Sequence, residues 1–277
     1  MFKPMKTAYF TVAACLAIAF SLPALAGTKD DRERDHNVQT DGNPPAETTD
    51  QARTRQDPTQ RFVESNVLET LYHEMGHALI DTMQLPVFGP EEFAADFFAA
   101  VLLDRVHGEK VTRQLIEDVT RSYQEDHRAD RAAGNSTSAW DTHGTPMQRY
   151  YNLACLYYGA DPEGRKHALK DFGLSDRADF CVGDYEMANY AWGDVLDQLA
   201  EDAPGDTIKL DWVLDNESHL TQFVKREVAA LNKMMSLPQA ITVSVIPCGE
   251  VNAYYDPEPR EVIICTELAE HLEKLAP

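Results

Sequence analysis

Beyond about residue 60, apolar positions recur every three to four residues along most of the chain, a pattern that predicts helices. Strand-like segments, rich in β-branched residues and bounded by turn residues, occur only near the C-terminus. The pattern therefore predicts an α+β fold, mainly helical, with a small antiparallel sheet or hairpin at the C-terminus. The predicted helices cover 66–84, 91–103, 110–130, 146–158, 185–199, 217–234 and 267–275, and the predicted strands cover 241–246, 251–255 and 261–265.

Residues 1–26 have the features of a secretory signal peptide. Two lysines precede an apolar run at 8–20, and Ala24-Leu25-Ala26 forms a small-x-small cleavage site. The apolar run is short for a membrane span. Cys15 could accept a lipid, but it lies in the middle of the run, so cleavage after Ala26 is favoured. We therefore expect an exported protein, periplasmic or secreted, without stable membrane insertion.

The segment 27–60 is charged and polar, with Val38 as its one aliphatic residue larger than alanine, which predicts a disordered leader. The remainder, 61–277, has a length typical of one domain. The formal net charge of −21 argues against nucleic acid or an anionic membrane as a partner. It would steer cationic peptides toward the protein, or it serves only to keep an exported protein soluble. The oligomeric state is left open.

Four cysteines follow the signal segment: Cys155, Cys181, Cys248 and Cys265. An even number in an exported protein favours disulfides, and three connectivities are possible. We favour Cys155–Cys181 and Cys248–Cys265, with the second bond tying the two arms of a hairpin. A structural zinc site with four cysteine ligands is the rival interpretation, but no Cys-x-x-Cys pair supports it.

The segment His73-Glu74-Met75-Gly76-His77 lies on the first predicted helix, which Asn66 and Glu69 would begin with a capping box. Residues four apart share a helical face, so the two imidazoles can bind one metal ion, with Glu74 at the edge of that face. Gly76 leaves the turn between the histidines bare, which suits close approach of another backbone. The alternative is an ordinary amphipathic helix with two solvated histidines.

A third ligand is available on the next predicted helix, where Glu92 and Asp96 lie four apart on one face. Catalytic zinc commonly takes two histidines, one glutamate and a water, which makes Glu92 the candidate third ligand. Asp96 could accept the remaining ring N–H of His73 and fix its tautomer. Alternatively, Glu91 and Glu92 are acids favoured at a helix N-terminus by the helix dipole.

The pattern His73-Glu74-x-x-His77 with Glu92-x-x-x-Asp96 resembles the zincin metallopeptidases, in particular the glutamate-ligand branch, the gluzincins. More closely, the chain resembles the bacterial DUF4344 metallopeptidase family. That resemblance rests on further blocks as well, among them 85–87, 89–96, 148–152 and 252–257. In the family's usual order the hairpin at 252–257 precedes the zinc helix, whereas here it follows. A permuted connection would therefore be needed to place the hairpin beside that helix.

The resemblance implies a zinc-dependent peptidase that acts on peptides or proteins. One zinc ion would be held by His73, His77 and Glu92, and Glu74 would be the general base that activates water. His143, which precedes the predicted helix at 146–158, is a candidate catalytic donor to the oxyanion, with Tyr150 or Tyr255 as rivals. The other interpretation of His143 is a capping or core-satisfying residue.

Arg149 is open to two interpretations at this point, a clamp for a substrate carboxylate or a buried ion pair, and the second is favoured. At the level of function, the alternative is a catalytically inactive zincin scaffold that binds or chaperones other proteins. Degenerate zincins typically lack the glutamate base or a histidine, and His73, Glu74 and His77 are all present. A third possibility is hydrolysis of a non-peptide amide at the same site, because specificity depends on the cleft rather than the fold.

Overall fold

The computed structural model describes residues 56–138 and 140–277. The predicted signal peptide, Cys15 and most of the predicted leader lie outside these residues. Within the described part, no helix has the length and apolar character needed to cross a membrane. The described helices are α2 (Pro58–Met83), α3 (Glu91–Val106), α4 (Glu109–Ala133), α5 (Pro146–Ala160), α6 (His167–Asp171), α7 (Ala178–Glu201), α8 (His219–Met234) and α9 (Thr266–Leu275), and the strands are β1 (Ile208–Val213), β2 (Ile241–Ile246), β3 (Ala253–Asp256) and β4 (Glu261–Cys265).

The four strands form one mixed sheet in the order β1-β2-β4-β3. The expected hairpin is present as the antiparallel pair β3–β4. Strand β2 runs parallel to β1, because helix α8 carries the chain back before β2 begins. Strand β2 is also parallel to β4. The α+β class is therefore confirmed, with parallel pairs in addition to the hairpin. Strand β1 was not predicted, although Ile208, Leu210 and Trp212 alternate with polar residues along it.

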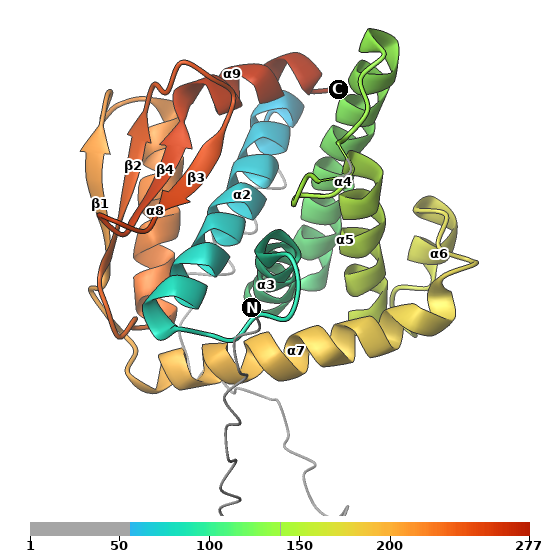
Figure 1. Cartoon of the computed structure of the whole chain (residues 1–277), viewed down its shortest axis with the longest axis horizontal. Coiled ribbons are helices and arrows are strands. Elements are labelled where there is room, and N and C mark those ends of the chain that lie inside the picture. The colour runs from blue at the N-terminus through green and yellow to red at the C-terminus, as the bar shows by residue number, and fades with distance from the viewer. Residues whose placement is uncertain (1–55, 139) are drawn as a thin grey trace, which may run out of the picture. The chain divides into compact units, whose positions relative to one another are not determined.

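Helix α2 lies between the sheet and helices α3, α4 and α5 (Figure 1). One side packs against β3 and β4, and the rest of its surface packs against α3, α4 and α9. Because neighbours surround it, nearly every residue from Phe62 to Ile80 is buried, including polar ones such as Glu69 and His73. The segment that carries the histidines is thus the centre of the core.

The start of α2 differs from the sequence prediction. The helix begins at Pro58, with the Asp57 side chain accepting hydrogen bonds from the backbone of Thr59 and Gln60. Asn66, the predicted cap, lies inside the helix, where its amide donates to the Phe62 carbonyl. An Asp-Pro pair is a typical helix start, but it falls within a stretch whose polarity had indicated a leader.

Gly76 is a point of close approach between α2 and α3, as its position between the histidines had suggested. A Cβ atom at Gly76 would lie 2.9 Å from Cα of Ala95, nearer than real Cβ atoms approach. The bare turn therefore lets α3 pack directly on the face of α2 that carries His73 and His77. This contact sets how far Glu92, on the first turn of α3, lies from the histidines.

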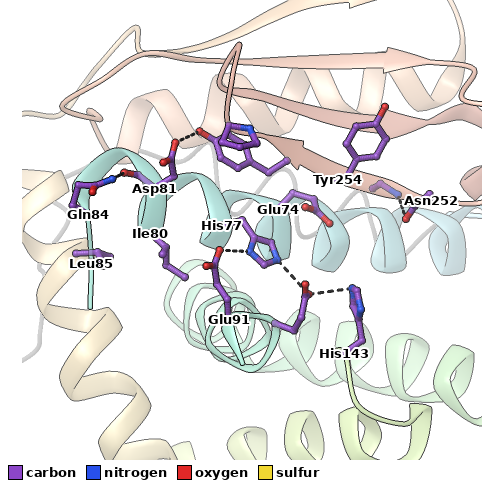
Figure 2. A pocket seen from close by; sticks show the side chains of 14 residues that line it. Glu74, His77, Ile80, Asp81, Gln84, Leu85, Glu91, His143, Asn252 and Tyr254 are labelled. Atoms are coloured by element: carbon purple, nitrogen blue, oxygen red, sulfur yellow. Dashed lines mark hydrogen bonds and ion pairs between the residues drawn. The ribbon is translucent and has the colours of Figure 1, made fainter. Parts of the chain in front are cut away.

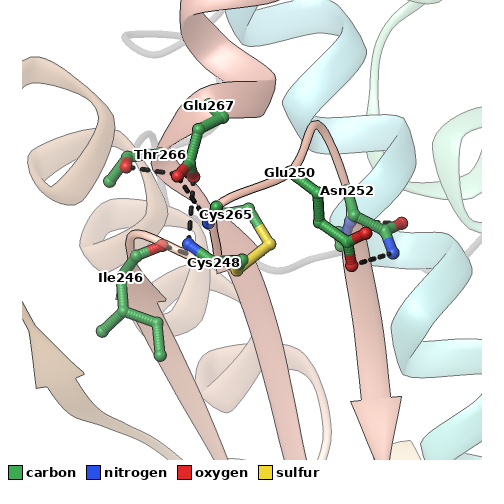
Figure 3. The surroundings of a disulfide bond; sticks show 9 residues. Ile246, Cys248, Glu250, Asn252, Cys265, Thr266 and Glu267 are labelled. Carbon is green, nitrogen blue, oxygen red and sulfur yellow. Dashed lines mark hydrogen bonds between the residues drawn. A yellow bond between two sulfur atoms is a disulfide. The ribbon is translucent and has the colours of Figure 1, made fainter.

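Both favoured disulfides are present. Cys155–Cys181 joins α5 to α7, and Cys248–Cys265 links the loop after β2 to the end of β4 (Figure 3). The expectation that the second bond ties the two arms of a hairpin is wrong. The bond joins Cys248, two residues after β2, to Cys265 at the end of β4, and β2 and β4 are parallel neighbours. The carboxylate of Glu267 accepts hydrogen bonds from the backbone N–H groups of Cys248 and Gly249. The loop that leads into β3 is therefore held at its start.

Candidate metal centre

Three donor atoms from α2 and α3 converge on one point. His73 Nε2 lies 3.2 Å from His77 Nε2 and 3.2 Å from Glu92 Oε2, and His77 Nε2 lies 3.3 Å from the same Glu92 oxygen. Atoms bound tetrahedrally to one zinc ion at about 2.0–2.1 Å lie about 3.3 Å from one another. The triangle therefore has the dimensions of a zinc site, and its donor set of two imidazoles and a carboxylate suits that ion.

The outward-facing nitrogen of each imidazole is held by a carboxylate. His73 Nδ1 lies 2.8 Å from Asp96 Oδ1, and His77 Nδ1 lies 2.7 Å from Glu91 Oε1. A hydrogen bond donated from Nδ1 leaves the Nε2 lone pair free to bind a metal ion. Asp96 contacts His73 as expected. The contact of Glu91 was missed, because two adjacent acids at a helix start had an adequate explanation in the helix dipole.

Burial and charge act in opposite directions on these groups. Burial alone would lower the pKa of His73, but hydrogen bonds with Asp96 and Glu92 raise it to about 10. The pKa of His77 is also raised, because Glu92 and Glu91 outweigh its burial. Burial would raise the pKa of Asp96, yet Arg149 and His73 hold it at about 2. Burial would likewise raise the pKa of Glu92, but its hydrogen bonds with His73 and His77 lower it. Asp96 and Glu92 are therefore ionised at neutral pH, and the centre favours positive charge.

Glu74 lies next to the donor triangle and lines the neighbouring cleft. Only 6% of its surface is exposed, and burial raises its pKa above the ordinary value although both histidines lower it. A carboxylate with a raised pKa is a better proton acceptor near neutral pH than a solvated one. Its position and environment therefore fit general-base chemistry.

The cleft beside the triangle has a volume of about 720 Å³. Figure 2 shows Asn252 and Tyr254 of the hairpin on one side, His143 and Glu91 on the other, and Glu74 between them. The C-terminal hairpin thus lies beside the histidine helix although it follows that helix in the chain. The remaining lining residues are His77, Ile80, Asp81, Gln84, Leu85, Glu92, Ala253, Tyr255 and Pro257.

Strand β3 has one unpaired edge, because it is the last strand of the sheet. The Cys265 N–H donates to the Asn252 carbonyl at 3.2 Å, so Asn252 and Tyr254 face β4 in an antiparallel ladder. By the same alternation, the backbone groups of Ala253 and Tyr255 point away from β4. The cleft therefore has extended backbone with outward-facing N–H and C=O groups along one wall.

The three candidate oxyanion donors occupy different places. His143 lies in the cleft, with 58% of its side chain exposed and its Nε2 3.1 Å from Glu92 Oε2. The hydroxyl of Tyr255 also reaches the cleft but donates to Asp81 at 2.8 Å. Tyr150 is buried, does not line this cleft, and its hydroxyl donates to the Phe172 carbonyl. The arrangement therefore leaves His143 and Tyr255 as candidates and removes Tyr150.

Arg149 forms the buried ion pair that the sequence analysis favoured. Its guanidinium binds both oxygens of Asp96, and it is absent from the lining of the cleft. A clamp on a substrate carboxylate would need the guanidinium in the cleft.

Comparison with known proteins adds a family to this geometry. Residues 43–196 and 209–276 match the model of the DUF4344 family, which is described as "Putative metallopeptidase". The chain belongs to the DUF4344 family. No curated protein and no solved structure matches it. Membership indicates a hydrolase that uses a metal ion and acts on peptides, and the match includes the residues of the donor triangle.

Proposed function

We propose that this DUF4344 protein is an exported, zinc-dependent peptidase in which His73, His77 and Glu92 hold one zinc ion. The observation that carries the proposal is the triangle of donor atoms, with sides of 3.2–3.3 Å and an outer carboxylate on each imidazole. The two imidazole nitrogens lie 3.2 Å apart, so they need either a metal cation between them or a proton on one of them. The two fixed Nδ1 hydrogen bonds support the cation.

A bound zinc ion would polarise the substrate carbonyl and lower the pKa of a water molecule toward 7. Glu74 would accept the proton of the attacking water and pass it to the leaving amine as the C–N bond breaks. Its burial supports both steps, because a raised pKa brings the acid and base forms closer in free energy. We assign the donor to the developing oxyanion to His143, because its side chain is exposed to the cleft and its Nε2, 3.1 Å from Glu92 Oε2, lies beside the donor triangle.

The shape of the cleft supports a peptide as the substrate. The Ala253 N–H already donates to Asn252 Oδ1 at 2.9 Å. The outward C=O of Ala253 and the outward N–H and C=O of Tyr255 can pair with an extended chain, which would be added to the sheet as a further strand. Such pairing holds a peptide by its main chain and places it along the wall that faces Glu74. An amide substrate without a peptide backbone would not use this edge.

The charge of the cleft indicates which peptides bind best. Four lining residues are acidic, namely Glu74, Asp81, Glu91 and Glu92, and none is lysine or arginine. A divalent ion would offset two of these charges and leave the cleft negative. We therefore infer a preference for peptides that carry lysine or arginine.

Export is supported by the two disulfides, which form and persist in oxidising compartments such as the periplasm or the extracellular space. The amino-terminal sequence of the mature protein, isolated from the culture medium or periplasm, tests this part of the proposal. A start at Gly27 would support cleavage after Ala26, and a start at a lipidated Cys15 would contradict it.

Zinc content and peptide turnover, measured on the same preparations, test the catalytic part. We expect about one zinc per chain in the wild type and in Glu74→Gln, and little in His77→Ala or Glu92→Ala. Glu74→Gln should have lost turnover of a quenched-fluorescent peptide library. The control is His271→Ala, which removes a histidine of α9 that forms an ion pair with Asp126 and does not line the cleft.

Three results would contradict the proposal in different places. Loss of zinc from Glu74→Gln would mean that Glu74 is a ligand rather than the base. A wild type that binds no zinc after reconstitution would exclude the metal site. A wild type that binds zinc but cleaves no library peptide would favour the alternative of an inactive scaffold with a binding role.

A further inference from the structure

Asp96, the carboxylate that holds His73, is itself held by Arg149 of helix α5. Arg149 Nε donates to Asp96 Oδ2 at 3.0 Å, and Arg149 Nη2 donates to Asp96 Oδ1 at 2.5 Å. The same Oδ1 accepts from His73 Nδ1 at 2.8 Å. With 9% of its side chain exposed, Asp96 has these two residues as its partners in the described part of the chain. Its orientation therefore depends on the arginine.

The guanidinium is fixed in turn by other elements. It lies over the ring of Tyr123 on α4, 4.9 Å from the ring centre. The Tyr123 hydroxyl donates to Glu69 Oε1 at 3.0 Å, and that oxygen lies 3.7 Å from Arg149 Nη2. Helices α2, α3 and α4 thus contribute a carboxylate or a ring to one arginine. A guanidinium restrained from three sides presents the same two N–H groups to Asp96 at all times.

Helix α5 begins close to the cleft, and its start is also restrained. Thr145 and Gln148 form a capping box, in which each side chain bonds to the other's backbone. His143 precedes this cap by two residues. The segment 148–152 has no catalytic role in the proposed function. Within it, Gln148 holds the end of the loop that carries His143, and Arg149 holds Asp96.

We infer that Arg149 is a positioning residue for the metal centre. It holds Asp96 in the orientation that presents Oδ1 to His73, and so directs His73 Nε2 toward the point shared with His77 and Glu92. Without Arg149, Asp96 would be a buried carboxylate bonded to one imidazole, free to turn about its χ2 angle. His73 would then lose its fixed ring orientation. This inference rests on the proposed function, because it assumes that the triangle binds zinc.

The chain contains a matched control in Arg165. This arginine is also buried, contacts Asp104 at 2.6 Å and Glu109 at 2.7 Å, and lies over the ring of Tyr157 at 4.3 Å. It has the same kinds of partner as Arg149, two carboxylates and a tyrosine face, but none of them contacts the donor triangle. Comparing a substitution of Arg149 with the same substitution of Arg165 separates the loss of a buried ion pair from an effect on metal binding.

The experiment measures zinc affinity by competition with a chromogenic chelator, and the visible spectrum of the cobalt-substituted protein, for the wild type and four variants. We expect Arg149→Met to weaken zinc binding by about 10- to 100-fold and to alter the cobalt bands. Arg149→Lys should recover part of the affinity, because an ammonium keeps the charge but cannot bind both oxygens. Arg165→Met and Arg165→Lys should lose comparable stability toward denaturant while zinc affinity stays within about twofold.

Equal effects of Arg149→Met and Arg165→Met on zinc affinity, or no effect of either, would overturn the inference while leaving the zinc site intact. If Arg149→Met does not fold, Arg149→Lys decides: wild-type affinity and cobalt bands in that variant would overturn the inference. A wild type that binds no zinc would overturn the proposed function itself, and this result is read before any variant is compared.

Discussion

Alanine at Gly76 should move the two helices that carry the donor triangle. The added Cβ would lie 2.9 Å from Cα and 3.2 Å from Cβ of Ala95, both on α3. Ordinary carbon contacts are about 3.5–4.0 Å, so the backbones must separate by roughly 0.5–1 Å. Overpacking of this kind costs about 1–3 kcal/mol. Alanine also stabilises a helix interior by about 0.5–1 kcal/mol relative to glycine, so we expect a net loss of up to about 2 kcal/mol.

Gly183 on α7 provides the control for this substitution. No atom lies within 4 Å of a Cβ built there, so Gly183→Ala should stabilise the protein by about 0.5–1 kcal/mol. The difference between the two variants, measured by chemical denaturation of chelator-treated protein, isolates the contact with Ala95. Since Glu92 is one turn from Ala95 on the same helix, Gly76→Ala should also weaken zinc binding by roughly tenfold.

Two outcomes would refute this reasoning. If Gly76→Ala were as stable as Gly183→Ala, the contact between α2 and α3 would not be tight. If Gly76→Ala lost stability but bound zinc with wild-type affinity, the spacing of the two helices would not control the donor triangle. The cobalt spectrum would distinguish a distorted site from a site with a lost ligand.

Three other predictions concern the metal centre, the hairpin and the cleft. The pKa of His73, about 10 against an ordinary 6.5, means that zinc must displace its proton at neutral pH. In the chelator-treated protein, protonated His73 contributes stability that is fully present below pH 6.5 and is lost as the pH rises toward 10. Because the competing proton is lost over the same range, zinc affinity should increase there. Calorimetry in buffers of different ionisation enthalpy should report proton release on binding, and its absence would contradict the assigned pKa. Replacing Cys248 and Cys265 together by serine should lower the free energy of unfolding by about 3 kcal/mol and raise KM more than it lowers kcat, because the hairpin lines the cleft. An unchanged KM would separate the hairpin from substrate binding. Finally, Asp81→Asn should reduce the ratio of kcat/KM for arginine-containing peptides to kcat/KM for glutamate-containing peptides. If this ratio is small in the wild type and does not change with salt, the charge argument is refuted.

Much of the local structure followed from residue patterns. The helical spacing of apolar residues located α2 and α3 and the C-terminal helix, and strand-like segments located β2 and β4 with the hairpin. The four-residue spacing of His73 and His77 predicted that they share a face, and their Nε2 atoms lie 3.2 Å apart. These predictions needed only the backbone geometry of one element at a time.

Other features could not be predicted because they depend on residues far apart in the chain. Glu91 is a plain helix-start acid in sequence and an outer partner of His77 in the fold. For Arg149, two interpretations were possible until its contact with Asp96, 53 residues away, was known. The start of α2 was missed for a related reason: the polar residues Arg61 and Ser65 bind Asp118 on α4, which composition does not reveal.

The sequence by itself determined which candidate residues share a helical face, because backbone hydrogen bonds set positions within a helix. The fold class followed from the same local patterns. Only the tertiary structure decided how far Glu92 lies from the histidines, which carboxylate holds each imidazole, and that a hairpin from the end of the chain forms a wall of the cleft. Those distances come from the packing of helix against helix and helix against sheet, where a bare turn at Gly76 or a guanidinium from α5 changes the geometry of the centre.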